Sequence, residues 1–304
     1  MLIDPWLWLL SLLVFLASAT TASQFDPYQL NGGLVSAVAG KDYIVIASDT
    51  RMVGPGGYDI LERNHLSSRI WEATEADGPF RRGTIALPTP PNPPLSGAAT
   101  ASQSLQLIST RSLTRPPVWI GSAGCQADCE MLKRTVRADL RSAVYFVQQP
   151  QQAHHVVSQV ATLLGQILYS RRGFPFYSFC VVAGMDHDRQ PKVYVYDAIG
   201  SSEQVAVASS GTGRELLQPI LDRKFRSRVD VEEQSAKRMQ AFGHIPLQQV
   251  DCSKDEAVSI LLEGYRAVAE REIGVGDQVA FCVMHCKSDG GYECQVWSAP
   301  LKNH

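Results

Sequence analysis

The stretch NGGLVSAVAGKDYIVIASDTR, residues 31–51, decides the fold of this chain. Two short runs rich in Val, Ile and Ala, Leu34–Ala39 and Tyr43–Ser48, flank the polar turn Gly40-Lys41-Asp42. β-Branched runs that are separated by a short turn containing glycine are typical of a β-hairpin. We therefore expect two antiparallel strands here, the second of which ends beside Asp49.

The rest of the chain alternates strand pairs with helix pairs. Apolar residues at helical spacing predict helices over Asp128–Gln148 and His154–Arg172, and a capping box at Ser253–Glu256 begins a third. The other elements predicted are strands at Val118–Ser122, Phe179–Met185, Lys192–Asp197, Val279–Met284 and Tyr292–Trp297, and a short helix at Arg214–Arg223. Antiparallel sheets covered by helices on their outer faces satisfy this order. The predicted fold class is α+β, a four-layer αββα sandwich.

Two segments differ in composition from this pattern. Residues 1–24 contain the apolar run Leu7–Ala19, which has the length of a signal-peptide core but follows Asp4 instead of basic residues. The run is signal-like, a pro-segment or an artefact of the gene model. Residues 76–115 include the proline-rich Pro88–Pro94, and this density of proline predicts a disordered insert or, as the alternative, an extended segment. The remainder, 25–304, is expected to form a single domain interrupted by that insert.

Composition excludes several classes of function. The formal net charge is −2, which favours neither nucleic acid nor an anionic membrane as a partner. The 7 cysteines are an odd number spread along the chain, which fits a reducing compartment better than a disulfide framework. His285 and Cys286 are neighbours at a strand end and point to opposite faces, so a zinc site with Cys282 and Cys294 is not expected. We predict no metal and no cofactor.

Several motifs occur in a fixed order along the chain. Residues 31–51 are followed by LYSRR at Leu168–Arg172, LQP at Leu217–Pro219 and AERE at Ala269–Glu272. Together they resemble the beta subunits of the 20S proteasome, in particular the non-catalytic type at the sixth position of the beta ring. The resemblance covers residues 25–75 and 116–304. It implies the fold of the N-terminal nucleophile hydrolases.

The resemblance also implies where an active site would lie. Active family members use an N-terminal threonine, whose own amine is the base, with a nearby Lys and Asp and an oxyanion turn. By the family's spacing, the threonine position is Gly33, or Gly32 if the turn is one residue longer. The other vestigial positions are Asp49, Arg69 in place of the lysine, Gly124 in the oxyanion turn, Thr212, Glu272 and Val275. No catalytic residue is predicted, and Thr20-Thr21 lies too far before Asp49 to replace the nucleophile.

The resulting hypothesis is a non-catalytic structural beta subunit of the proteasome core, which degrades proteins in an ATP- and ubiquitin-dependent way. The resemblance implies as partners the other beta subunits of a seven-membered ring, the alpha ring and the opposite beta ring. It also implies a place in the cytoplasm and nucleus. Two alternatives stay open: an active threonine endopeptidase, which would need a nucleophile, and a secreted binding protein, which Leu7–Ala19 would explain.

Overall fold

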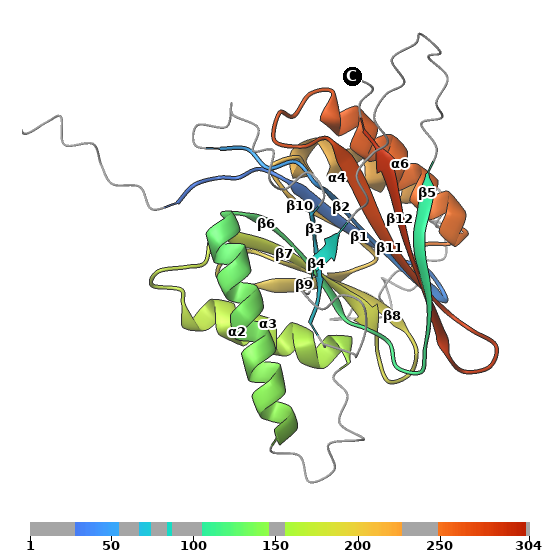
Figure 1. Cartoon of the computed structure of the whole chain (residues 1–304), viewed down its shortest axis with the longest axis horizontal. Coiled ribbons are helices and arrows are strands. Elements are labelled where there is room, and N and C mark those ends of the chain that lie inside the picture. The colour runs from blue at the N-terminus through green and yellow to red at the C-terminus, as the bar shows by residue number, and fades with distance from the viewer. Residues whose placement is uncertain are drawn as a thin grey trace, which may run out of the picture.

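The computed structural model describes residues 28–54, 67–73, 84–86, 105–145, 156–226 and 249–301. Within these ranges two six-stranded sheets are stacked on one another, and helices cover both outer faces (Figure 1). Neighbouring strands in both sheets run antiparallel. This arrangement agrees with the predicted α+β sandwich.

The first sheet has the strand order β10-β1-β2-β11-β12-β5. Its strands are β10 (Val207–Gly211), β1 (Leu34–Ala39), β2 (Tyr43–Asp49), β11 (Gln278–Cys286), β12 (Tyr292–Pro300) and β5 (Gln106–Leu113). The second sheet has the order β4-β3-β6-β7-β8-β9. Its strands are β4 (Thr84–Ala86), β3 (Ser67–Glu72), β6 (Trp119–Gly124), β7 (Ser178–Met185), β8 (Pro191–Tyr196) and β9 (Ser202–Val205).

Among the described residues, two helices cover each sheet. Helices α2 (Gln126–Tyr145) and α3 (Val157–Ser170) bury their apolar faces against the second sheet. Helices α4 (Arg214–Arg226) and α6 (Lys254–Ala269) do the same against the first sheet. The serine half of the predicted capping box is confirmed at the start of α6, where the Ser253 hydroxyl accepts a hydrogen bond from the Glu256 N–H at 3.2 Å.

Strand β1 shows why the core has layers. Leu34 and Val38 point outward into the cluster shared with α6, whereas Val35 and Ala37 point inward to the cluster between the sheets. Because successive strand residues face opposite sides, a strand buried on both faces is apolar at most of its positions, and its buried Ser36 hydroxyl contacts Tyr265 Oη. This explains the continuous run of small and β-branched residues in the opening hairpin.

The prediction of a disordered insert over 76–115 is wrong at two places. Residues 106–113 form the edge strand β5, which pairs with β12, and residues 84–86 form β4, which pairs with β3. Ile108 and Leu113 pack against the cluster between the sheets, so the free edge of β12 gives this polar sequence both hydrogen bonds and apolar contacts. Pro88–Pro94 and residues 1–24 lie outside the described residues. No helix in the described part of the chain is long and apolar enough to span a membrane.

Candidate functional site

The predicted site centres on Asp49, the last residue of β2. Its side chain is fully buried, and its Oδ1 atom accepts the Leu34 N–H at 2.9 Å. Its Oδ2 atom accepts the Gly276 N–H at 3.2 Å. Burial raises the pKa of the Asp49 carboxyl, while Arg69 and these two N–H groups act in the opposite direction. Asp49 thereby ties the start of β1 to the segment before β11.

Arg69 on β3 is the charged partner of Asp49. Its Nε atom lies 3.1 Å from Asp49 Oδ1, and both side chains are almost completely buried. Its Nη2 atom donates to the carbonyl of Arg51 and, at 3.3 Å, to that of Asn31. The Arg69 guanidinium therefore links Asp49 to the backbone of the segments on both sides of the opening hairpin.

Gly33 and Gly32 precede β1 in backbone conformations that favour glycine, with φ values of +101° and +71°. An ideal Cβ on Gly33 would lie 2.0 Å from Arg69 Nε and 2.1 Å from Arg69 Cζ. A Cβ on Gly32 would lie 2.8 Å from the carbonyl oxygen of Gly274. The Arg69 guanidinium therefore fills the volume that a side chain at position 33 would need.

Three other predicted positions, Thr212, Glu272 and Val275, lie around Gly33 and Arg69, some in direct contact and some through another residue. Thr212 donates its N–H to the Gly33 carbonyl at 2.9 Å, which brings it directly to the site. Glu272 accepts the Gly274 N–H at 3.1 Å, and Gly274 in turn accepts the Gly33 N–H at 2.9 Å. Val275 is fully buried in the cluster beneath α6.

The predicted oxyanion turn is linked to the site by Asn31, which the sequence analysis did not single out. The Asn31 N–H donates to the Gly124 carbonyl at 3.0 Å, and its carbonyl accepts the Val53 N–H at 3.2 Å. Its side chain accepts the N–H of Gln126, the first residue of α2, at 2.9 Å. Asparagine is a common capping residue, but Asn31 lies 95 positions from this helix, so local sequence gives no sign of the contact.

A second buried ion pair was also missed. Arg51 follows β2 and binds Asp277 Oδ1 through Nε at 3.1 Å and Nη2 at 2.8 Å. Asp277 has a positive φ of 64°, which is uncommon for a residue with a side chain. The pair fixes the turn that carries Gly276 to Asp49.

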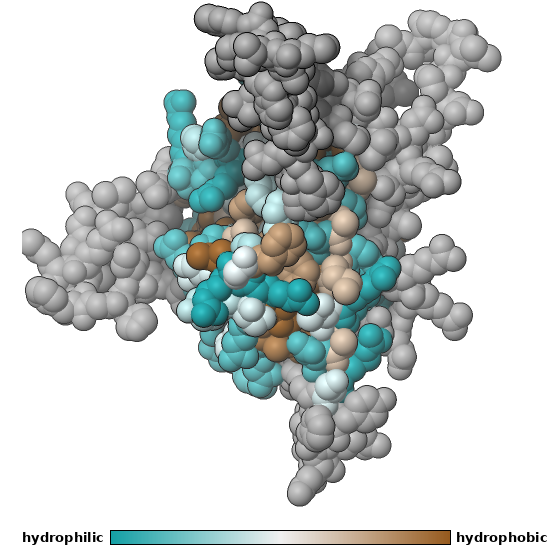
Figure 2. Space-filling view, turned by 90° about the vertical axis from the view of Figure 1, so that its left-hand side faces the viewer, coloured by the Kyte–Doolittle hydropathy of each residue, from teal (hydrophilic) through white to brown (hydrophobic). Residues whose placement is uncertain are grey.

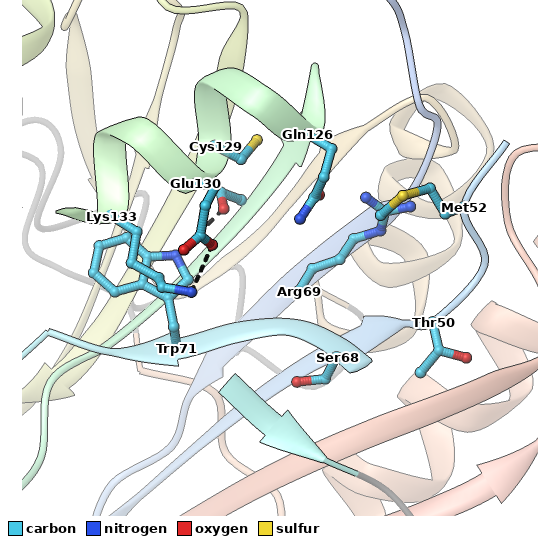
Figure 3. Close-up of a pocket in the computed structure, with 10 residues that line it drawn as sticks. Thr50, Met52, Ser68, Arg69, Trp71, Gln126, Cys129, Glu130 and Lys133 are labelled. Atoms are coloured by element: carbon cyan, nitrogen blue, oxygen red, sulfur yellow. Dashed lines mark hydrogen bonds and ion pairs between the residues drawn. The ribbon is translucent and has the colours of Figure 1, made fainter. Parts of the chain in front are cut away.

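A cavity of about 210 Å³ opens beside Arg69 (Figure 3). It is bounded by the end of β2, by β3, by β6 and by the first turns of α2, with Met52, Trp71 and Ser122 among its lining residues. The Glu130 carboxylate and the Lys133 ammonium pair at 2.7 Å on one side of it.

The arrangement has consequences for chemistry. Position 33 carries no hydroxyl, and its nitrogen is an amide that donates to Gly274 instead of a free amine that could act as a base. The Ser48 hydroxyl accepts the Arg69 N–H at 3.0 Å, and the Ser36 hydroxyl contacts Tyr265 Oη at 3.1 Å. The site holds a buried charge pair in a dense network of backbone hydrogen bonds, which suits a structural role.

A stacked pair of antiparallel sheets with outer helices, in which the second strand ends on a buried acid facing the start of the first strand, defines a protein of the N-terminal nucleophile hydrolase type. Comparisons with known proteins narrow this class. The family described as "Proteasome subunit" matches residues 106–244. The chain is 31% identical over 254 residues to proteasome subunit beta type-1 of Dictyostelium discoideum, which covers 84% of this chain and 82% of that one.

Two further relatives have the same name. The chain is 28% identical over 270 residues to proteasome subunit beta type-1 of Arabidopsis thaliana, covering 88% of this chain and 93% of that one. It is 26% identical over 261 residues to the subunit of this name from Danio rerio, covering 86% and 84%. The chain belongs to the proteasome subunit family, and within it resembles the beta subunits of type 1. The resemblance inferred from the motifs is confirmed.

Proposed function

We propose that this chain is a non-catalytic, structural beta subunit of the 20S proteasome. It helps to close a seven-membered beta ring, contacts the alpha ring and the opposite beta ring, and thereby supports ATP- and ubiquitin-dependent protein degradation in the cytoplasm and nucleus. The similarity to beta type-1 subunits over most of the chain supports the beta-subunit part of this proposal.

The observation that carries the non-catalytic part is the interlocking of Gly33 with Arg69. The position where the family places its nucleophile has no side chain, and the guanidinium lies 2.0 Å from where a Cβ would be. A base is missing as well, because the Gly33 nitrogen is an amide that donates to the Gly274 carbonyl, whereas the family's base is the free amine at this position. The hypothesis of an active threonine endopeptidase would need both groups.

The segment before Gly33 supports the same conclusion. Tyr28 packs against Phe174 and Tyr177 with ring centroids 5.6 Å and 5.5 Å apart, and its hydroxyl donates to the Pro175 carbonyl at 3.0 Å. Asn31 adds its contacts to Gly124, Val53 and Gln126. A segment that is anchored in this way holds the chain in place before β1, so Gly33 is kept as an internal residue.

Exposed side chains suit the proposed partners. Tyr169 and Phe174, at the end of α3 and just after it, are 57% and 66% exposed. Aromatic residues are enriched in protein interfaces, where they supply large contact areas. On the face shown in Figure 2, small groups of hydrophobic residues lie among hydrophilic ones.

Purification of 20S particles from cells that express the tagged full chain tests this proposal. The chain is expected to co-migrate with assembled particles in the same amount as its neighbouring beta subunits. Treatment with a threonine-directed epoxyketone should label other subunits of the same particles, which serve as the internal control, and leave this chain unmodified. An adduct mapped to this chain would establish an active enzyme. Recovery from the medium alone would establish the secreted binding protein.

A further inference from the structure

We propose that the outer edge of strand β5 (Gln106–Leu113) binds an extended, acidic segment of a partner protein, which adds a further strand to the first sheet. Backbone hydrogen bonds hold the segment, and the side chains of Leu107 and Arg111 select its sequence. This binding goes beyond the proposed function, because it concerns recognition by one strand edge and not the assembly of rings.

The open edge of β5 is the first observation that points to such a partner. β5 pairs with β12 on one side and is the last strand of the first sheet, at the margin of the fold in Figure 1. No strand in the described part of the chain pairs with its other side. An edge of this kind presents a row of backbone donors and acceptors to which a further strand can bind.

Length distinguishes β5 from the other three edge strands. β5 has 8 residues, whereas β10, β4 and β9 have 5, 3 and 4. Proteins usually protect an edge by keeping it short or by placing proline or several charges on it. β5 contains no proline, and Arg111 is its single charged residue. A register shift interrupts its ladder near the start, but residues 109–113 pair with β12 in continuous register.

The charges around β5 favour an acidic partner. Residues 105–116 contain Arg111 and Arg115 and no acidic residue. Glu293, which pairs with β5 from β12, lies 4.0 Å from Lys287. Three basic side chains thus accompany one acidic side chain, and a negatively charged segment complements this excess. The same excess opposes the pairing of β5 with a second copy of itself, which would bring two positive clusters together.

The two faces of β5 differ in the side chains that they offer. Leu107 pairs with Trp297 and is 45% exposed, which provides an apolar contact on the outer face of the sheet. Arg111 pairs with Cys294, a member of the cluster between the sheets, and therefore lies on the inner face. A segment in which apolar and acidic residues alternate places one kind beside each of these side chains.

Fluorescence anisotropy of the full chain with a labelled nine-residue peptide of alternating valine and glutamate tests the proposal. Binding should saturate and should weaken as the salt concentration rises. The same peptide with N-methyl groups on consecutive central amides cannot pair with a strand edge, so it should bind at least tenfold more weakly. Equal affinity for the methylated and the unmethylated peptide would overturn the proposal.

Two charge reversals form a matched pair. Arg111→Glu should lower the affinity for the valine–glutamate peptide about tenfold and raise the affinity for a valine–lysine peptide. Arg223→Glu changes the net charge of the chain by the same amount and should leave both affinities unchanged. Arg223 is exposed on α4, which packs beside β10 at the opposite edge of the sheet. Equal effects of the two variants would show unspecific attraction and refute the site.

Amide hydrogen exchange of the unmodified chain covers the case in which Arg111→Glu does not fold. The valine–glutamate peptide should slow exchange severalfold within residues 106–113 and leave β10 unchanged, and protection confined to another region would contradict the proposal. Full protection of every amide of β5 before the peptide is added would mean that the edge is already occupied. A dimer in sedimentation would then identify a second copy, and a monomer would identify another part of the same chain; either result would overturn the proposal.

Discussion

Replacing Gly33 by alanine places a methyl group inside the Arg69 guanidinium, with the ideal Cβ 2.0 Å from Nε and 2.6 Å from Nη2. The alanine must also adopt the left-handed φ of +101°, which costs about 1–3 kcal/mol. If the guanidinium moves away, the buried pair with Asp49 breaks, at about 3–5 kcal/mol. The expected loss is about 4–8 kcal/mol of unfolding free energy, a large share of the roughly 5–15 kcal/mol that folded proteins have.

Urea unfolding of the full chain, followed by circular dichroism, measures this loss. Gly173→Ala is the matched control, because a Cβ at Gly173 would meet nothing within 4 Å and its φ is not left-handed. In an Arg69→Lys background the Gly33→Ala change should cost less by about 1 kcal/mol or more, since lysine lacks the planar fork that fills this space. A Gly33→Ala chain as stable as the Gly173→Ala control would refute the interlock.

Three further outcomes follow from single contacts. Burial, and after it the charge of Lys254, lowers the pKa of His285 below its ordinary value of 6.5. The contribution of His285 to the free energy of unfolding is therefore complete above pH 6.5 and decreases as the pH falls below it. His285→Gln should flatten this pH dependence in unfolding curves measured between about pH 7 and 5. Tyr265→Phe removes a hydroxyl that donates to the Ala47 carbonyl at 2.9 Å and should lower the free energy of unfolding by about 1–3 kcal/mol. Tyr169 is 57% exposed, so Tyr169→Phe should leave the free energy of unfolding almost unchanged in the same measurement. Ser253→Ala removes the cap of α6 and should lower stability by about 1 kcal/mol, with faster amide exchange confined to the first turn of that helix.

Most of the sandwich was predictable because its strands and helices follow from patterns of residues that are close together in the sequence. The opening hairpin, with its continuous apolar strands, and the capping box of α6 each depend on neighbouring residues. Strand β5 was not predictable in this way, because the burial of Ile108 and Leu113 depends on the edge of β12, which is far away in sequence. Tertiary pairing decided its structure against a composition that favours loops.

The candidate site likewise contains residues that the sequence predicted and residues that it did not. The family spacing placed Asp49, Arg69 and Thr212 near Gly33, and the contacts between them follow from strand ends that meet at one edge. The roles of Asn31 and Gly276 were not predictable, because their contacts join segments separated by 95 and 227 positions. Every residue except proline has a backbone N–H, so a contact made by this group cannot be recognised from the type of residue.

The resemblance places a threonine and a lysine where this chain has Gly33 and Arg69. In the structure these two differences depend on each other, because the Arg69 side chain fills the space beside Gly33. The guanidinium reaches past Asp49 to two backbone carbonyls and in doing so occupies the space of a side chain at position 33. With arginine at 69, only glycine fits at 33, and the left-handed φ then excludes other residues independently. A Gly33→Thr substitution alone should therefore destabilise the chain without creating a nucleophile, even if the chain were cleaved before it. Under the proposed non-catalytic function, hydrolysis would require changes at both positions and a free amine, which the anchored segment from Tyr28 to Gly32 opposes.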